Sequence, residues 1–283
     1  MVYKLNLKII SIILIAIIAL LVVVKTVPAN ANVQQTKLPV IMYHHILENS
    51  NKLGDYVISP KQFEQDIKYI TDKGYTAITS KELLNFLKYG DTLPEKPIMI
   101  TFDDGYESVY KYAYPILKKY NQKAITLIIG KYTDLFSDEN EPRHINYSHL
   151  SYKQLLEISD MFEIGNHTYN MHQNAQGKRY GCKKISGETY EDYKLALTND
   201  VGYLSQKIID NIGYKPKCFA YPFGAISKES KVVLEDFGFE VFFTCLEKVN
   251  IIEPFTKTPV YINRFNRPTK YSTKEFFNKM DIN

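Results

Sequence analysis

Apolar segments of strand length alternate with segments of helical spacing along most of the chain, and this alternation limits the possible folds more than any other feature. The run KPIMITF at 96–102 has the length of a buried strand, and residues 106–120 after it have helical spacing. Other strands are expected at 38–43, 75–79, 123–130, 161–165, 217–222, 239–245 and 259–265. This alternation predicts an α/β fold with a mostly parallel sheet covered by helices. Seven or eight strands in about 250 residues suit a closed or nearly closed barrel, and a doubly wound open sheet is the alternative.

Capping residues and prolines mark the helices between these strands. Ser59 precedes Pro60 at the start of a helical stripe, and Gln62 completes a capping box with Ser59. Pro115 lies inside the helix expected at 106–120, where its ring and missing N–H should kink the helix. The start of each helix marks the end of the strand before it. These ends matter because functional residues in parallel α/β proteins lie at the carboxyl ends of the strands.

The first 31 residues differ from the rest of the chain. Lys4 and Lys8 precede a sixteen-residue run at 9–24 that is apolar except for one serine, and Ala-Asn-Ala follows at 29–31. This order is typical of a signal peptide, and the apolar run is also close to the length of a membrane span. In either case the rest of the protein would be exported, to the extracellular space or the cell surface. The expected organisation is a signal peptide or N-terminal membrane anchor (1–31), a linker (32–37) and one domain (38–283).

Charge and cysteine content exclude several classes of protein. Three of the 35 basic residues lie in the first 31 positions, which leaves 32 against 31 acidic residues in the remainder. A nearly neutral domain has no basic field for nucleic acid, so we expect no nucleic-acid partner. Three cysteines do not form a disulfide framework, and we expect Cys218 and Cys245 to be core residues of strands rather than a bridge.

Polar side chains that suit a hydrolytic metal site follow several of the expected strands. His167 and His172 are five residues apart, a spacing that matches neither a helical face nor a strand face, so a shared role requires a turn. Asp103 and Asp104 would repel each other at the end of a buried strand unless a cation lies nearby. A surface turn and unrelated loop histidines are the alternative explanations of these two motifs. The other strand ends carry His44, His45, Tyr221, Pro222, Phe223 and Arg264.

Together these residues could perform metal-assisted hydrolysis. One aspartate and two histidines form a three-ligand Zn²⁺ site with a position left for water, and the second aspartate is free to act as general base. His44 is a candidate general acid for the leaving group, and the backbone N–H of Phe223 is a candidate oxyanion donor. Thr168 could hold the histidines in place through a hydrogen bond.

The motifs TFDDG, HTYNMH and AYPFG resemble the first three motifs of the NodB-homology polysaccharide deacetylases, carbohydrate esterase family 4. The resemblance covers roughly residues 38 to 280 and implies a distorted (β/α) barrel with about seven parallel strands. It also implies metal-dependent removal of acetyl groups from N-acetylated sugars. By motif, Asp103 corresponds to the general base, Asp104 to the metal-binding aspartate, and His167 and His172 to the metal-binding histidines.

Three departures from the common pattern resemble one branch of this family, the poly-β-1,6-N-acetylglucosamine deacetylases. The two histidines are five rather than four residues apart, and Ala220 stands where the third motif usually has an arginine. The usual C-terminal Leu-x-His is missing, and MYHHI stands near the start instead. In that branch the histidine after the tyrosine is the general acid, which corresponds to His44, whereas His45 would be structural or a residue of the cavity rim. Tyr221, Pro222 and Arg264 are then expected to contact the oxyanion or the substrate.

We therefore expect an exported, metal-dependent deacetylase that acts on N-acetylglucosamine residues of a β-1,6-linked exopolysaccharide or of peptidoglycan. Zn²⁺ is the expected metal from the ligand types, and Co²⁺ or Ni²⁺ would also fit. We expect a monomer whose N-terminal segment lies in or passes through the membrane. A catalytically silent carbohydrate-binding module of the same fold is the second hypothesis. A glycosidase is a third, but adjacent carboxylates rarely stand the roughly 5–9.5 Å apart that glycosidases require.

Overall fold

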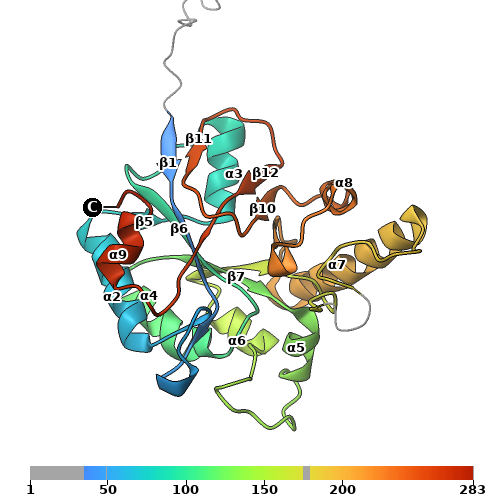
Figure 1. Ribbon diagram of the computed structural model, residues 1–283, viewed down its shortest axis with the longest axis horizontal. Coiled ribbons are helices and arrows are strands. Elements are labelled where there is room, and N and C mark those ends of the chain that lie inside the picture. The colour runs from blue at the N-terminus through green and yellow to red at the C-terminus, as the bar shows by residue number, and fades with distance from the viewer. Residues whose placement is uncertain (1–34, 49, 175–178, 283) are drawn as a thin grey trace, which may run out of the picture. The chain divides into compact units, whose positions relative to one another are not determined.

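A computed structural model describes residues 35–48, 50–174 and 179–282, and their centre is one parallel sheet (Figure 1). The strand order is β12-β10-β9-β8-β7-β6-β2-β13, with β5 paired to β6, and all of these neighbours run parallel. These strands are β2 (Val40–Tyr43), β5 (Thr76–Ala77), β6 (Pro97–Phe102), β7 (Ala124–Ile128), β8 (Phe162–Asn166), β9 (Cys218–Ala220), β10 (Val241–Phe243), β12 (Val260–Ile262) and β13 (Phe265–Asn266). The predicted distorted (β/α) barrel is confirmed.

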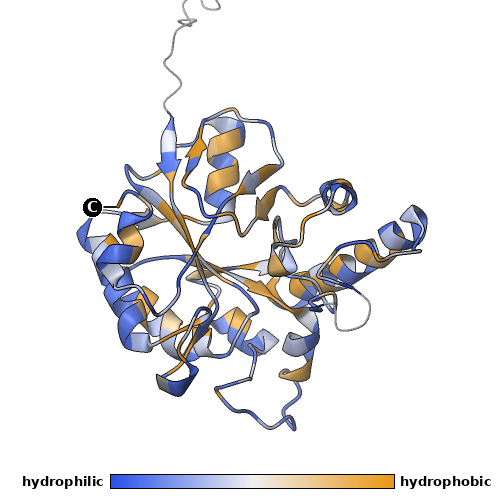
Figure 2. Ribbon diagram, in the orientation of Figure 1, coloured by the Kyte–Doolittle hydropathy of each residue, from blue (hydrophilic) through white to orange (hydrophobic). Residues whose placement is uncertain are grey.

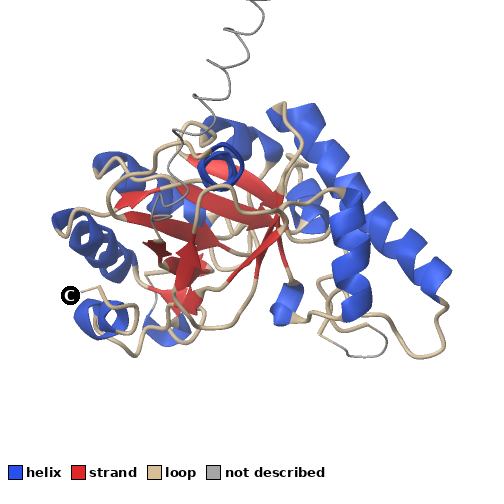
Figure 3. Cartoon of the chain, turned by 90° about the horizontal axis from the view of Figure 1, so that it is seen from above, coloured by secondary structure: helices blue, strands red, loops and turns tan. Residues whose placement is uncertain are grey.

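Helices surround the strands, which lie in the middle when the domain is seen from above (Figure 3). The helices are α2 (Pro60–Asp72), α3 (Ser80–Tyr89), α4 (Tyr114–Lys119), α5 (Gly130–Leu135), α6 (Tyr152–Glu157), α7 (Tyr190–Ile212), α8 (Lys228–Phe237) and α9 (Thr273–Asn278). Short helical turns are η1 (Ser50–Lys52), η2 (Val109–Ala113) and η3 (Pro222–Gly224). The short helix α5 had no counterpart among the sequence predictions.

The curled sheet has a seam between its two end strands, which are not paired with each other in the described part of the chain. β12 and β13 stand at opposite ends of the strand order, yet two residues, Asn263 and Arg264, connect them in the chain. The first and last parts of the domain meet there, because β13 pairs with β2 through Phe265 and Ile41. Arg264 therefore lies at this seam.

Two small sheets flank the barrel. Strand β1 (Thr36–Leu38) pairs antiparallel with β11 (Asn250–Ile252), and β3 (His45–Ile46) pairs with β4 (Val57–Ile58). Residues 36 and 37, expected in a linker, are thus part of the folded domain. The predicted leader lies outside the described residues, and in the described part of the chain no helix has the length and apolarity to span a membrane.

The strands are buried on both faces, which explains their continuous apolar sequences. All six residues of β6 are buried. Its Ile98, Ile100 and Phe102 pack outward against helices, whereas Met99 packs inward with residues of other strands such as Leu127 and Val241. Figure 2 shows the resulting concentration of hydrophobic residues along the strands.

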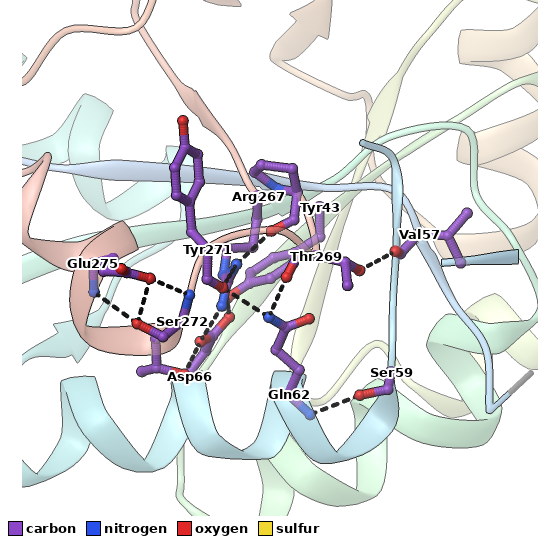
Figure 4. Close-up of polar contacts among 12 residues, drawn as sticks. Tyr43, Val57, Ser59, Gln62, Asp66, Arg267, Thr269, Tyr271, Ser272 and Glu275 are labelled. Carbon is purple, nitrogen blue, oxygen red and sulfur yellow. Dashed lines mark hydrogen bonds and ion pairs between the residues drawn. The ribbon is translucent and has the colours of Figure 1, made fainter. Parts of the chain in front are cut away.

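The helix boundaries follow the sequence signals with two differences. The Ser59 hydroxyl accepts a hydrogen bond from the backbone N–H of Gln62, as expected of an N-cap, but the Gln62 side chain donates to the carbonyls of Thr269 and Tyr271 instead of completing a capping box (Figure 4). Pro115 does not kink a continuous α-helix. The π-helical turn η2 precedes it, so that the proline stands in the first turn of α4, where a missing N–H costs little.

The described cysteines are all free thiols. Cys218 is a core residue, as predicted. The same prediction is wrong for Cys245, which is exposed, because strand β10 ends at Phe243 and the chain leaves the core there.

Candidate functional site

The carboxyl ends of the strands surround a cavity of about 450 Å³. His44 follows β2, Asp103 and Asp104 follow β6, and His167 follows β8. The cavity walls include these residues together with Met42, His45, Tyr56, Val57, Tyr106, His172, Tyr180, Phe223, Cys245 and Asn266. Most of the residues selected from the sequence therefore meet in one place, although they come from distant parts of the chain.

Asp104, His167 and His172 form a compact group of potential metal ligands. One ligand atom from each lies within 4.8 Å of the others. The Nε2 atoms of His167 and His172 are 3.6 and 3.3 Å from Oδ1 of Asp104. Burial lowers the pKa of both histidines, to about 3 for His172, so each imidazole is neutral at pH 7 and offers a lone pair.

A divalent cation fits this group. Burial, with a smaller contribution from Asp103, raises the pKa of Asp104 to about 7 when no cation is beside it. A cation held by the carboxylate and two neutral imidazoles would stabilise the ionised form of Asp104. Two nitrogen ligands and one oxygen ligand are a donor set that Zn²⁺ accepts.

A turn after β8 brings the two histidines together. Thr168 has a positive φ of 72°, and its N–H donates to Oδ1 of Asn166. The carboxylate of Asp200, on α7, accepts hydrogen bonds from the next two N–H groups, those of Tyr169 and Asn170, at 2.7 and 2.9 Å. Asn166 and Asp200 could not be predicted as parts of the site, since nothing in the sequence links them to the turn.

The orientation of His167 is set by a backbone carbonyl rather than by Thr168. Nδ1 of His167 lies 2.8 Å from the Ala220 oxygen, so the Nδ1–H donates and Nε2 keeps its lone pair towards Asp104. The Thr168 hydroxyl is buried and has no hydrogen-bond partner among the described residues, so the hydrogen bond expected from it is not formed. Thr168, whose backbone is left-handed, does not line the cavity.

The two adjacent aspartates point to different partners, because the backbone of Asp104 is left-handed, with a φ of 70°. Gly105 follows with a φ of 74°, and a Cβ at this position would lie 2.9 Å from the Ile128 side chain. Glycine is thus required at this turn, as the TFDDG motif indicates.

Asp103 forms a buried, bidentate ion pair with Arg264. The two guanidinium nitrogens lie 2.6 and 2.8 Å from the two carboxylate oxygens. Burial alone would raise the pKa of Asp103, but the Arg264 charge outweighs it and holds that pKa well below its usual range. Arg264, expected to contact the oxyanion or the substrate, does not line the cavity: its side chain is fully buried and also donates to Thr101 and to the Thr244 carbonyl. The positive charge beside Asp103 thus comes from Arg264, which lies outside the AYPFG motif.

His44 and His45 have different surroundings. His44 faces the cavity, its Nδ1 has no partner among the described residues, and burial lowers its pKa to about 4 against the opposing effect of Asp103. His45 is buried, with Nδ1 2.7 Å from the Ser108 hydroxyl and its ring stacked on Tyr106 at 4.1 Å. These contacts agree with a structural role for His45.

The AYPFG segment contributes one residue to the cavity wall rather than three. Phe223 has a φ of 57°, is 41% exposed, and its ring centroid lies 4.4 Å from that of His172. Tyr221 is fully buried against Phe219 and Phe242, and Pro222 is buried too. The prediction that Tyr221 and Pro222 contact substrate is therefore not supported by their positions, since neither lines the cavity.

The chain belongs to the polysaccharide deacetylase family, whose model matches residues 90–242. This range includes the metal-ligand group and Asp103, and it excludes His44 and Arg264. The match to the family model therefore says nothing about His44, which precedes this range, or about Arg264, which follows it.

Individual relatives and solved structures show which members of the family the chain is similar to. The poly-β-1,6-N-acetyl-D-glucosamine N-deacetylase of Staphylococcus aureus (strain MRSA252) is 29% identical over 206 residues, which cover 72% of this chain and 66% of that protein. The chain thus matches slightly less than two thirds of that relative's length. IcaB from Ammonifex degensii is 27% identical, with a TM-score of 0.68 over 87% of this chain and 97% of that one. A de-N-acetylase from Aggregatibacter actinomycetemcomitans shares the fold, with a TM-score of 0.71, 23% identity and coverage of 86% and 99%.

Proposed function

We propose that this protein is a metal-dependent polysaccharide deacetylase that hydrolyses the N-acetyl group of N-acetylglucosamine residues in a cell-surface glycan. The observation that carries the proposal is the position of Asp103, which is ionised, held by Arg264, and faces the same cavity as Asp104, His167 and His172. The substrate is a β-1,6-linked exopolysaccharide, in line with the relative from Staphylococcus aureus, or the glycan of peptidoglycan.

In this proposal Asp104, His167 and His172 hold a divalent metal, with Zn²⁺ as the first choice and Co²⁺ or Ni²⁺ as alternatives. When bound, the metal supplies a water of lowered pKa and polarises the acetyl carbonyl. Asp103 accepts a proton from the attacking water. Its low pKa makes it a weak base, which suffices only because the water has been made more acidic.

His44 protonates the leaving nitrogen. With a pKa of about 4 it is neutral at pH 7, so it must take up a proton during the cycle before it can donate one. The backbone N–H of Phe223 stabilises the developing oxyanion. We also propose that the enzyme is exported, that its N-terminal segment lies in or passes through the membrane, and that it is a monomer. Export rests on the composition of residues 1–31.

The test is acetate release from N-acetylglucosamine oligomers by the zinc-loaded protein. β-1,6-linked and β-1,4-linked oligomers are compared, with Asp103→Asn as the inactive control and metal content measured for both proteins. Release from the β-1,6 oligomer alone supports the exopolysaccharide, and release from the β-1,4 oligomer alone supports peptidoglycan. A metal-loaded protein that binds the oligomers and releases no acetate would instead be the silent carbohydrate-binding module.

A further inference from the structure

A second cavity, of about 470 Å³, shares Asp104, Tyr106 and His172 with the first. We call it the aromatic pocket. Its remaining walls come from α5, from the residue before it and from the segment after it, namely Ile129, Tyr132, Leu135, Phe136, Glu141, Asn146, Tyr147 and His149. Because the two cavities share residues of the metal-ligand group, a polymer held at that group would extend a neighbouring sugar towards the aromatic pocket.

The aromatic pocket has a wall of stacked rings. Tyr106 stacks on His149 with centroids 4.6 Å apart, and His149 stacks on Tyr132 at the same distance. Tyr132 and Tyr147 are 39% and 51% exposed, so the wall presents aromatic surface to a ligand. Burial lowers the pKa of His149 to about 4, which keeps its ring neutral at pH 7. The rings themselves therefore carry no positive charge, and the one cation expected beside the pocket is the metal that Asp104 and His172 would hold.

Glu141 gives this pocket a negative charge. It is half-buried, and among the described residues that line the pocket it is the one carboxylate apart from Asp104, with no lysine or arginine beside it. The nearest arginine in sequence, Arg143, is used elsewhere: it pairs with Glu107 and donates to the carbonyls of Phe136 and His149. Arg143 thus binds two backbone carbonyls of the wall and the carboxylate of Glu107, and it forms no ion pair with Glu141.

We propose that the aromatic pocket binds a neighbouring glucosamine residue, a sugar whose acetyl group has already been removed, through its protonated amine. Tyrosine faces attract an ammonium group, and a carboxylate beside them adds a charged hydrogen bond. An N-acetylglucosamine at this position offers a neutral amide and gains neither interaction. The inference rests on the proposed function, and it means that one deacetylated residue favours deacetylation of the next acetylated residue along the polymer.

Binding measurements test the aromatic pocket without requiring turnover. The full-length, zinc-loaded protein is titrated calorimetrically with a fully deacetylated and a fully acetylated β-1,6-linked tetramer, below the pKa of the amine. We expect the deacetylated tetramer to bind about 10-fold more tightly, since a partly desolvated cation–π contact has roughly this effect. Glu141→Gln should remove this preference, whereas Glu139→Gln, the same charge change at an exposed position of the same segment, should keep it.

Two results would overturn the inference: equal binding of the two tetramers by the unchanged protein, or a preference that survives Glu141→Gln. Turnover then separates this inference from the proposed function. A tetramer with one glucosamine should have a kcat/KM about 10-fold above that of the fully acetylated one, and Glu141→Gln should equalise the two. A preference in binding without any acetate release would contradict the proposed function and leave the aromatic pocket as a site for amino sugars.

Discussion

Two buried Arg–Asp pairs stand three residues apart in the segment NRFNR, and they differ in what surrounds the carboxylate. Arg264 holds Asp103 at the cavity, and Arg267 holds Asp66 between α2 and the C-terminal segment. Both arginines are at most 1% exposed. In both pairs the guanidinium contacts both carboxylate oxygens.

The difference lies in the remaining lone pairs. Asp66 also accepts hydrogen bonds from the hydroxyls of Tyr43 and Thr273, at 3.1 and 2.7 Å, and it is fully buried. Asp103 lines the cavity, where its carboxylate can meet a ligand. The same ion pair can therefore serve stability or chemistry, and the deciding factor is whether the carboxylate keeps an open side.

The largest effect should come from Asp103→Asn. Loss of the proton acceptor should lower kcat by about 10²- to 10⁴-fold while the metal content stays the same. The measurement is acetate release together with metal analysis of the purified variant. Unchanged acetate release would contradict the role of Asp103 as base.

Asp66→Asn is the matched change at the other pair. Breaking a buried ion pair leaves Arg267 without its counter-charge and should lower the free energy of unfolding by about 3–5 kcal/mol. Denaturant unfolding measures this loss. At temperatures where the variant is folded, kcat should match that of the unchanged protein, and a parallel loss of kcat would show that the two pairs are not separate.

Arg264→Lys should have a smaller effect on turnover. Lysine keeps the charge and loses the bidentate geometry, so Asp103 should be less well positioned, and we expect kcat to fall about 10-fold with little change in KM. Arg267→Lys serves as the control, with an effect on stability alone. Equal values of kcat for the two variants would argue against a positioning role for Arg264.

The smallest effect is expected for Tyr43→Phe, which removes one hydrogen bond to Asp66 and leaves the ring. The free energy of unfolding should fall by about 1 kcal/mol. Thermal and denaturant unfolding measure the change. A loss as large as that of Asp66→Asn would mean that the tyrosine hydroxyl, rather than Arg267, holds the carboxylate.

The sequence predicts the barrel and most of the cavity residues, because strand-length runs and polar residues at their ends are local signals. It does not predict the partner of Arg264, which lies 161 residues away and depends on how the barrel closes. Nor does it predict that the Ala220 carbonyl orients His167, since a backbone contact carries no side-chain signature. Thr168 and Tyr221 show the converse: both stand beside motif residues, yet backbone geometry and packing turn them away from the cavity.

The seam of the barrel also has a consequence for the order in which the protein is assembled during synthesis. The candidate metal ligands and the groups that hold them, up to Asp200 and Ala220, all precede β13 in the chain. Strand β13 pairs with β2, next to His44, and is more than 200 positions later in the chain than β2. Closing so long a loop is entropically costly and slow. Under the proposed function, a nascent chain that has passed residue 220 but not residue 264 would have its metal ligands and still lack Arg264, so that the ability to bind metal would precede the ability to react.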